Sequence, residues 1–377
     1  MKIVWFLWRR MNESGQQDAV QPQPLPARGG AQPSAGRGVP APKDARAAQS
    51  GPPPVLTGAK GAPAVSLDAQ SRPNAGRPAP APGKAGRRPA APRLNRNGKV
   101  HPAFSDDALR RAWQQVKANG GGPGVDGVDI QAFEAHLAQQ LADLQAELSQ
   151  GSYQPQTVRR VLIPKRNEGL RPLAIWTLRD RLAQRAVLNA VEPLFEPRFL
   201  ACSHGFRPGR STQSAAEMVI AARDDGLRWV LDADIKECFD NIDPTLLMQL
   251  VRRQLHDMAL LRLIELWLQA RILTAAGQVR AAGAAQGGVL SPLLCNIYLH
   301  QFDVALTKRG LHLVRYADDF VVLNQRRKEA EAAQETAQAA LAALRLEFNP
   351  YKTRIVHFDQ GFKFLGRFFV RDEVFEL

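Results

Sequence analysis

The chain has 377 residues, enough for roughly two or three domains, but its composition divides it near residue 100. Residues 1–100 hold 16 of the 27 prolines, and residues 11–100 contain no aromatic side chain. Such a segment cannot bury enough apolar surface to offset its conformational entropy. We therefore expect residues 1–100 to be a disordered tail rich in Pro, Ala, Gly and Arg, and residues 101–377 to form one folded unit.

The formal net charge of +14 is concentrated in this tail. Residues 1–100 hold 16 Lys and Arg against 4 Asp and Glu, which leaves 34 against 32 for the folded part, so the tail carries +12 and the folded part +2. Bulk charge therefore says little about the partner of the fold. Two interpretations of the tail stay open: a basic arm that binds phosphate backbones, and a passive linker or the product of a start codon assigned too far upstream.

Secretion, membrane insertion and disulfide bonding are not indicated. The apolar run at residues 3–8 is far shorter than the ~20 residues of a membrane helix and lacks the order of a secretion signal. Cys202, Cys238 and Cys295 are widely spaced and form no Cys-x-x-Cys pair, so neither a disulfide framework nor a zinc site is predicted. We expect a cytoplasmic protein without a membrane partner.

The predicted elements of the folded part mix helices with antiparallel hairpins. The first is a helix between the N-cap Ser105 and Gly120, followed by a helix over residues 130–150 and by a hairpin of strands at 157–165 and 171–178. The later elements, in order, are a helix opened by Asp180, a helix after residue 213, a strand at 228–235, helices at 244–255 and 259–273, a helix from Ser291, two strands with an acidic turn at 311–323, a helix at 327–344 and strands at 353–358 and 362–369. This order predicts an α+β fold.

Two acidic sites interrupt strongly apolar strand sequence. Asp232 and Asp234 close one strand, and the adjacent Asp318 and Asp319 lie at the turn of the later hairpin. Like charges on a rigid turn are unfavourable unless a cation compensates them, and carboxylate oxygens suit Mg²⁺. Two such ions ~3.5–4 Å apart can stabilise both the attacking and the leaving oxygen of a phosphoryl transfer. An Asp-Asp pair by itself is more often an ordinary turn.

The surrounding sequence favours the catalytic interpretation. Tyr-Ala-Asp-Asp at residues 316–319 resembles the motif of bacterial reverse transcriptases related to group II intron proteins, and further blocks follow in the family order over roughly residues 120–370. These blocks are Lys165 with Arg171-Pro172-Leu173, Asp180-Arg181 with Gln184, residues 205–211, Asp234-Ile235-Lys236 with Phe239-Asp240, residues 286–292 with Asn296, Lys352-Thr353 and Phe364-Leu365-Gly366.

The resemblance implies the fingers and palm of a right-hand polymerase, an antiparallel palm sheet and the activity of an RNA-directed DNA polymerase. Asp234, Asp318 and Asp319 would be the catalytic, metal-binding carboxylates, and the backbone carbonyl of Ile235 would add a metal ligand. The cofactor would be two Mg²⁺ ions, with Mn²⁺ as the alternative. The implied partners are an RNA template, a DNA primer and deoxynucleoside triphosphates.

The resemblance also implies residues that bind nucleotide and nucleic acid. Phe239 would exclude a 2′-hydroxyl, Gly287 would allow close backbone approach, and Lys352 would protonate the pyrophosphate, with a solvated lysine as the alternative. The whole nucleotide-binding set would be Lys165, Arg171, Phe239, Gln286, Gly287 and Lys352, and Arg207 and Arg210 would hold template phosphates.

Three features depart from the family pattern or qualify it. Ala285 and Trp176 stand where the family usually has Pro, which predicts altered loop geometry without loss of chemistry. His204 and His256 are interpreted as packed or solvated side chains and not as metal ligands. Because the sequence ends at Leu377, directly after the last palm block, we expect no helical thumb, and hence low processivity or a partner subunit that supplies the grip.

Three classes of function stay open. The first is an active reverse transcriptase in a mobile-element-derived or CRISPR spacer-acquisition system, the latter favoured because residues 296–300, residues 315–319 and the final segment resemble CRISPR-associated members; a CRISPR integrase would then be a partner. The second is an RNA-binding splicing factor with incidental polymerase activity. The third is a truncated remnant, against which the intact Asp234, Asp318 and Asp319 argue.

Overall fold

The computed structural model describes residues 100–164, 170–273, 277, 279–281, 284 and 286–377. Residues 1–99 of the predicted tail, Lys165 and Ala285 lie outside the described residues, and for Arg171 only the backbone is described. Within the described ranges, no helix combines the length and apolar character needed to cross a membrane.

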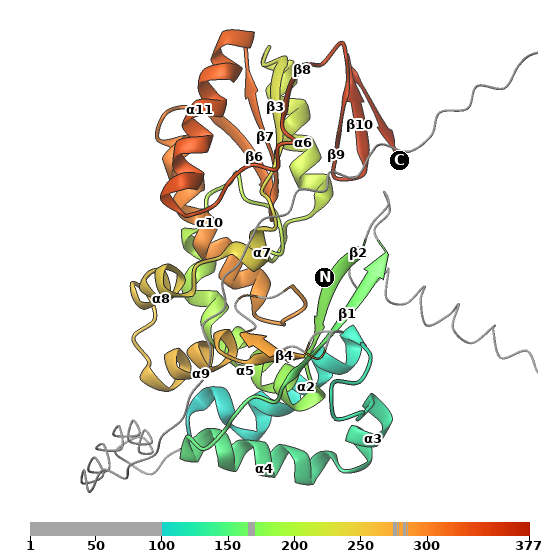
Figure 1. Cartoon of the computed structure of the whole chain (residues 1–377), viewed down its shortest axis with the longest axis vertical. Coiled ribbons are helices and arrows are strands. Elements are labelled where there is room, and N and C mark those ends of the chain that lie inside the picture. Colours follow the sequence, from blue (N-terminus) through green and yellow to red (C-terminus); the bar gives the residue numbers. More distant parts are fainter. Residues whose placement is uncertain (1–99, 165–169, 274–276, 278, 282–283, 285) are drawn as a thin grey trace, which may run out of the picture. The chain divides into compact units, whose positions relative to one another are not determined.

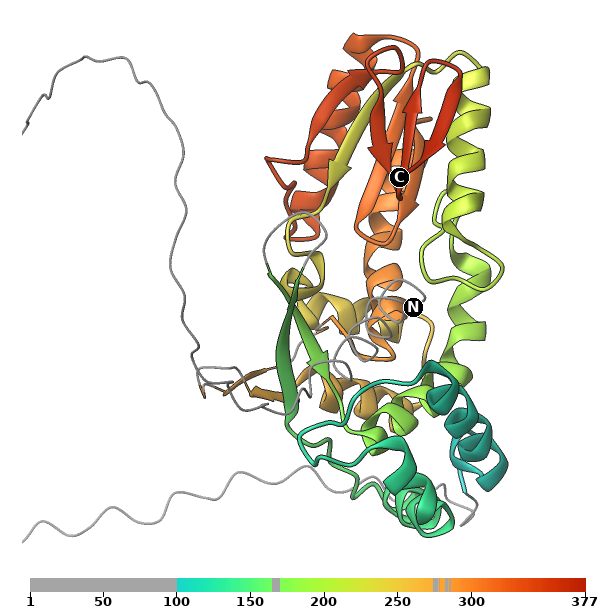
Figure 2. The same ribbon diagram turned by 90° about the vertical axis from the view of Figure 1, so that its right-hand side faces the viewer.

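An antiparallel sheet with the strand order β6-β7-β3-β8 carries both acidic sites (Figure 1). Helix α6 packs on one face of this sheet, and α10 and α11 pack on the other (Figures 1 and 2). We call it the palm sheet; it agrees with the predicted α+β class. Its strands and helices are β3 (Trp229–Asp234), β6 (His312–Tyr316), β7 (Asp319–Asn324), β8 (Arg354–His357), α6 (Thr212–Asp224), α10 (Ser291–Thr307) and α11 (Arg327–Ala343).

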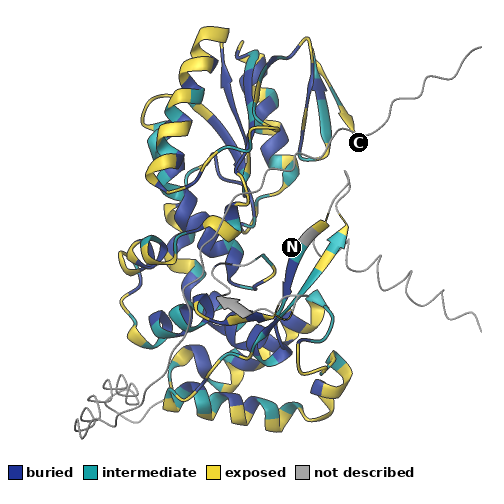
Figure 3. Ribbon diagram, in the orientation of Figure 1, coloured by how far each residue is buried: buried dark blue, intermediate teal, exposed yellow. Residues whose placement is uncertain are grey.

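Both faces of the palm sheet are buried, as Figure 3 shows for its inner strands. Successive side chains of a strand point to opposite faces. In β7, Phe320 and Val322 join the core with α10 and α11, whereas Val321 and Leu323 join a second apolar cluster with α6. Asp319 begins the same strand on the face of Val321, so its side chain is exposed at the end of a largely apolar layer.

The remaining described strands form two further sheets. One has the order β2-β1-β4-β5 and contains the predicted hairpin, in which Val161 lies opposite Leu173. The other, β11-β10-β9, packs against the α6 side of the palm sheet through Phe362 and Phe369. The bounds are β1 (Val158–Pro164), β2 (Leu170–Ile175), β4 (Arg271–Leu273), β5 (Val279–Ala281), β9 (Phe362–Phe364), β10 (Arg367–Val370) and β11 (Glu373–Glu376).

Helices pack beneath the β1–β2 hairpin and join it to the palm. The long helix α5 contacts both α2 and α10, so it connects the two regions. Ser105 caps α2 and Gly120 ends it, as predicted. The helices are η1 (Pro102–Phe104), α2 (Asp106–Asn119), α3 (Ile130–Ala135), α4 (Leu137–Gln150), α5 (Leu178–Phe195), η2 (Glu196–Arg198), α7 (Cys238–Asn241), α8 (Pro244–Arg252) and α9 (Met258–Leu268).

The structure corrects three predicted boundaries. The helix expected over residues 130–150 is two helices, because His136 leaves the helical conformation at φ −122° and ψ 25°. The helix expected over 259–273 ends at Leu268, since Ile272 pairs with β1 instead. The strand expected over 362–369 is a hairpin that turns at Leu365 and Gly366, both with positive φ.

Asp180 was predicted to open α5, but the helix begins at Leu178 and Asp180 is its third residue. The N-cap is Thr177, whose hydroxyl accepts from the Asp180 backbone N–H at 3.1 Å and donates to its carboxylate at 2.8 Å. Tyr153 donates to the same carboxylate at 2.6 Å and accepts from Trp267 Nε1 at 3.0 Å. Burial raises the pKa of Asp180, and these hydrogen bonds offset only part of that effect. The network ties α5 to α9.

The substitution Tyr153→Phe is expected to lower the free energy of unfolding by about 1–3 kcal/mol, because it leaves a buried acceptor with one donor fewer. Urea unfolding followed by circular dichroism measures this change. Tyr351→Phe is the matched control, since that side chain is 98% exposed and should leave the unfolding midpoint unchanged. Equal midpoints for both variants would contradict the assigned role of the network.

Candidate active site

The pairing of β3 with β7 brings two of the three predicted carboxylates together. In this register Asp234 lies directly opposite Asp319, and directly opposed residues on one sheet face have neighbouring side chains. Asp318 occupies the turn between β6 and β7, and its backbone carbonyl accepts from the Ile235 N–H at 3.3 Å. Residues far apart in the sequence therefore converge at one end of the palm sheet.

The electrostatics of the three carboxylates are unfavourable. Burial raises the pKa of Asp319 well above its ordinary value, and repulsion from Asp318 and Asp234 raises it further. Lys352 offsets part of this charge, since its Nζ lies 2.9 Å from Asp234 Oδ2. Burial alone would lower the pKa of Lys352, but the carboxylates outweigh that effect and raise it. The surroundings clearly disfavour the ionised form of Asp319.

Asn349 is a site residue that the sequence analysis missed. Its backbone N–H donates to the Asp234 carbonyl at 2.8 Å, and its side-chain amide donates to Asp234 Oδ2 at 3.2 Å. These two bonds hold both the main chain and the carboxylate of Asp234. The only sequence signal was its position three residues before Lys352.

The carboxylates suit a cation that also binds substrate oxygens. No three His, Cys, Asp or Glu side chains form a complete ligand group for a metal ion in the part of the chain that the structure describes. Mg²⁺ is usually bound by one or two carboxylates together with substrate phosphates, and not by an all-protein cage. Two features fit a cation bound jointly by carboxylates and substrate. The ionised form of Asp319 is disfavoured, and the Lys352 ammonium group already pairs with Asp234.

A loop between η2 and α6, residues 203–211, packs against the turn that carries Asp318. A Cβ atom added at Gly205 would lie 2.4 Å from the Ala317 nitrogen, so only glycine fits here. The Gly205 carbonyl accepts from Asn296 Nδ2 at 2.8 Å, and the Phe206 ring lies 5.9 Å from that of Tyr316. The predicted template-binding block is thus in direct contact with the turn that carries Asp318.

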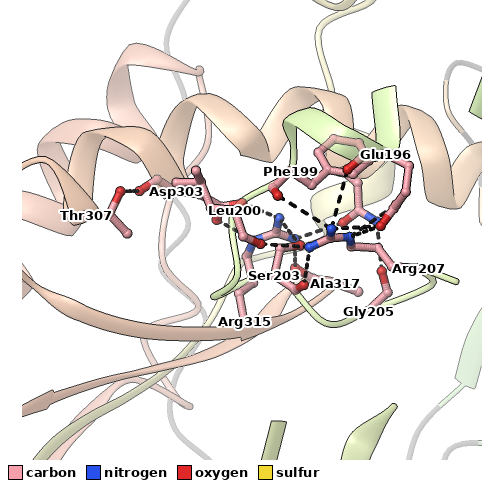
Figure 4. Close-up of polar contacts among 11 residues, drawn as sticks. Glu196, Phe199, Leu200, Ser203, Gly205, Arg207, Asp303, Thr307, Arg315 and Ala317 are labelled. Carbon is pink, nitrogen blue, oxygen red and sulfur yellow. Dashed lines mark hydrogen bonds and ion pairs between the residues drawn. The ribbon is translucent and has the colours of Figure 1, made fainter. Parts of the chain in front are cut away.

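Arg207 is engaged inside the protein. Its guanidinium donates to the Glu196 carboxylate at 2.8–3.2 Å and to the carbonyls of Leu200 and Ser203 at 2.7 Å (Figure 4). Only 6% of this side chain is exposed. Because internal acceptors take its donors, the geometry disfavours the predicted phosphate contact. Arg210 in the same loop is half-buried, and its contact with template phosphate stays a prediction.

Two of the predicted nucleotide-binding residues, Gln286 and Gly287, lie in a loop that packs against the end of β2. Gly287 has φ +113°, and a Cβ there would lie 2.3 Å from the Ala174 carbonyl oxygen, so the expected close approach is to the backbone at the end of β2. The Gln286 carbonyl accepts from the Ala174 N–H at 2.9 Å. Gln184 holds the same loop, since its Oε1 accepts from the Val289 N–H at 2.9 Å.

Two further predictions concern the neighbourhood of this loop and of β3. Trp176, which departs from the family pattern, is buried with its Nε1 3.3 Å from the position of a Cβ at Gly288, so it packs under the loop. Phe239 is half-buried in α7, close after Asp234, where Glu237 turns the chain with φ +44°. His204 is buried and burial lowers its pKa to about 4, in agreement with a packed histidine.

The substitution Asp319→Asn is expected to raise the thermal unfolding midpoint when divalent cations are absent, because it removes a charge that Asp318 and Asp234 repel. A gain of 1 kcal/mol would correspond to about 2–4 °C for a chain of this size. Differential scanning calorimetry in EDTA measures it, with Asp372→Asn at an exposed ion pair as the control. An unchanged or lower midpoint for Asp319→Asn would contradict the electrostatic account.

Comparison with known proteins agrees with this geometry. Residues 163–368 match the family model described as reverse transcriptase (RNA-dependent DNA polymerase). Protein YkfC of Escherichia coli K12 is 39% identical over 290 residues, which cover 66% of this chain and 76% of YkfC. The group II intron-encoded protein LtrA of Lactococcus lactis subsp. cremoris is 39% identical over 194 residues, which cover 51% of this chain but only 32% of LtrA.

Among solved structures, a partial Cas6-RT-Cas1–Cas2 complex matches with 25% identity and a TM-score of 0.39, over 64% of this chain and 40% of that chain. The family model covers more than half of the chain, and YkfC matches over three quarters of its own length. The chain therefore belongs to the reverse transcriptase family.

Proposed function

We propose that this chain adds deoxynucleotides to a primer on an RNA template by two-metal phosphoryl transfer. The observation that carries the proposal is the convergence of Asp234, Asp318 and Asp319 at one end of a sheet that is buried on both faces. A structural role does not explain why a carboxylate at Asp319 is placed beside Asp318 and Asp234, since both of them repel its charge. Their charge is suited to cations that enter with the substrate.

The chain's own residues would divide the work by position. Asp234 and Asp318 would bind metal, with the Ile235 carbonyl as a further ligand, and Asp319 would support them. Two bound Mg²⁺ ions, which reverse transcriptases use or replace with Mn²⁺, would activate the primer hydroxyl and stabilise the departing pyrophosphate. Lys352, which is ion-paired with Asp234, would give a proton to that leaving group.

The nucleotide and the template would meet the site from the fingers side. Lys165 and Arg171 would bind the triphosphate of the incoming nucleotide through their cationic donors. In the sequence Lys165 follows the last residue of β1, and the backbone of Arg171 lies in β2. Gln286 and Gly287 would lie along the new base pair, and Arg210 would hold template phosphate.

The host system is proposed from the resemblance of the sequence alone. Residues 296–300 and 315–319 resemble CRISPR-associated reverse transcriptases and favour spacer acquisition from RNA, with an integrase as partner. The similarity to LtrA favours instead an intron-derived element. A spacer-integrase gene beside this one would support the first system, and flanking intron RNA would support the second.

Primer extension tests the central proposal. The full-length chain, given a labelled DNA primer on an RNA template with deoxynucleotides and Mg²⁺, is expected to lengthen the primer, and the Asp318→Ala/Asp319→Ala variant is expected to give background only. Circular dichroism should show that the variant folds. Extension by the folded double variant would show that Asp318 and Asp319 are not the catalytic carboxylates. If the wild type extends primers on neither RNA nor DNA templates, the result would argue against a polymerase.

Sugar selection tests the role of Phe239. The substitution Phe239→Ala is expected to lower the preference for deoxynucleotides over ribonucleotides by roughly 10²-fold, because it removes the bulk that would meet a 2′-hydroxyl. The ratio of kcat/KM values for dATP and ATP measures this preference. Phe133→Ala, in α3, is a control for the loss of a packed ring. A ratio that changes equally in both variants would reject the gate.

A further inference from the structure

Arg315 is a fully buried arginine of β6, just ahead of the catalytic turn. Its Nε donates to Asp303 Oδ1 and its Nη2 donates to Asp303 Oδ2, each at 2.6 Å. Asp303 lies in α10 and is also fully buried. This bidentate pair neutralises both charges. Burial alone would lower the pKa of Arg315, but the Asp303 carboxylate outweighs burial and raises it, so the arginine stays charged.

The donors that Asp303 does not use reach three other parts of the chain (Figure 4). Nη1 donates to the Ala317 carbonyl at 3.0 Å and to Asn296 Oδ1 at 3.1 Å, and Nη2 donates to Ser203 Oγ at 2.8 Å. A guanidinium has five N–H groups, and each has an acceptor here. The side chain therefore joins α10, the 203–211 loop and the catalytic turn.

The turn needs such support because its backbone is strained. Ala317 has φ +57°, a left-handed conformation that costs a non-glycine residue about 1 kcal/mol or more. Its carbonyl is held by Arg315, and its nitrogen lies against Gly205. The next carbonyl, that of Asp318, is held by the Ile235 N–H. Both peptide groups that flank the Asp318 Cα are thus fixed, and with them the direction of its side chain.

We propose that Arg315 is a positioning residue for catalysis, which holds the Ala317 peptide so that the Asp318 carboxylate is presented to the metal-binding site. This inference rests on the proposed function, and it gives Arg315 a role in that function without contact with substrate. The same arginine links the turn to the 203–211 loop through Ser203 and Asn296, so displacement of that loop would be transmitted to Asp318.

A buried ion pair kept only for stability is the competing explanation. Apolar residues of similar volume commonly replace such a pair without loss of stability, so stability alone does not require an arginine here. A purely stabilising pair would also not need donors directed at the Ala317 carbonyl. The two explanations differ in what a stable replacement would do to the turn and to its affinity for Mg²⁺.

The substitution Arg315→Lys separates them, because a lysine retains the charge beside Asp303 but cannot serve all these acceptors. Hydrogen exchange is expected to become faster at the backbone amides of residues 317–319. The Mg²⁺ concentration for half-maximal primer extension should rise about 10-fold, the equivalent of roughly one lost hydrogen bond, while KM for the nucleotide stays within about twofold. Leu144→Ala in α4 is the control for general destabilisation.

The outcomes decide the proposal as follows. Wild-type exchange at residues 317–319 in folded Arg315→Lys, or a Mg²⁺ shift of equal size in Leu144→Ala, would overturn it. If Arg315→Lys does not fold, Ser203→Ala removes one acceptor and leaves the pair with Asp303; faster exchange at the turn then supports the proposal, and unchanged exchange rejects it. If the wild-type protein does not extend primers, the proposed function fails. Hydrogen exchange at residues 317–319 needs no activity and still shows whether Arg315 holds the turn.

Discussion

Negative charge at the end of an apolar sheet is the constraint on which this structure depends. Asp234 and Asp319 face each other across two strands whose apolar side chains are mostly buried, and Asp318 is the neighbour of Asp319 in the sequence. Burial and mutual repulsion both act against the ionised form of Asp319. Folding must therefore hold the three carboxylates where cations can reach them, and the surrounding contacts are explained by that requirement.

The contacts around the turn supply the needed rigidity from opposite sides. Ile235 and Asn349 bind main-chain groups of Asp318 and Asp234, while Arg315 and Gly205 fix the peptide of Ala317. A strained backbone of this kind persists only where its surroundings over-determine it. The buried Arg315–Asp303 pair is explained by this function, since buried pairs add little to stability by themselves.

The contacts that several residues make could not be predicted from the linear sequence, because they join segments that are far apart in the chain. Arg207 matches a family block and was expected to meet phosphate, yet Glu196 and nearby carbonyls surround it. Asn349 and Gln184 hold the carboxylate and the 286–290 loop through bonds between distant segments. Spacing rules describe one helix or strand at a time, so bonds of this kind leave no periodic signal.

The sequence by itself determined the α+β class, the β1–β2 hairpin, the cap of α2 and the identity of the three carboxylates, because apolar periodicity, capping residues and short family blocks are local properties. Only the tertiary structure decided that Asp234 lies opposite Asp319, that residues 271–273 leave a helix to join a sheet, and that Arg315 binds the carbonyl of Ala317. Strand register, long-range pairing and the acceptors of a buried guanidinium depend on which segments meet in space, and that is settled by packing of the whole chain.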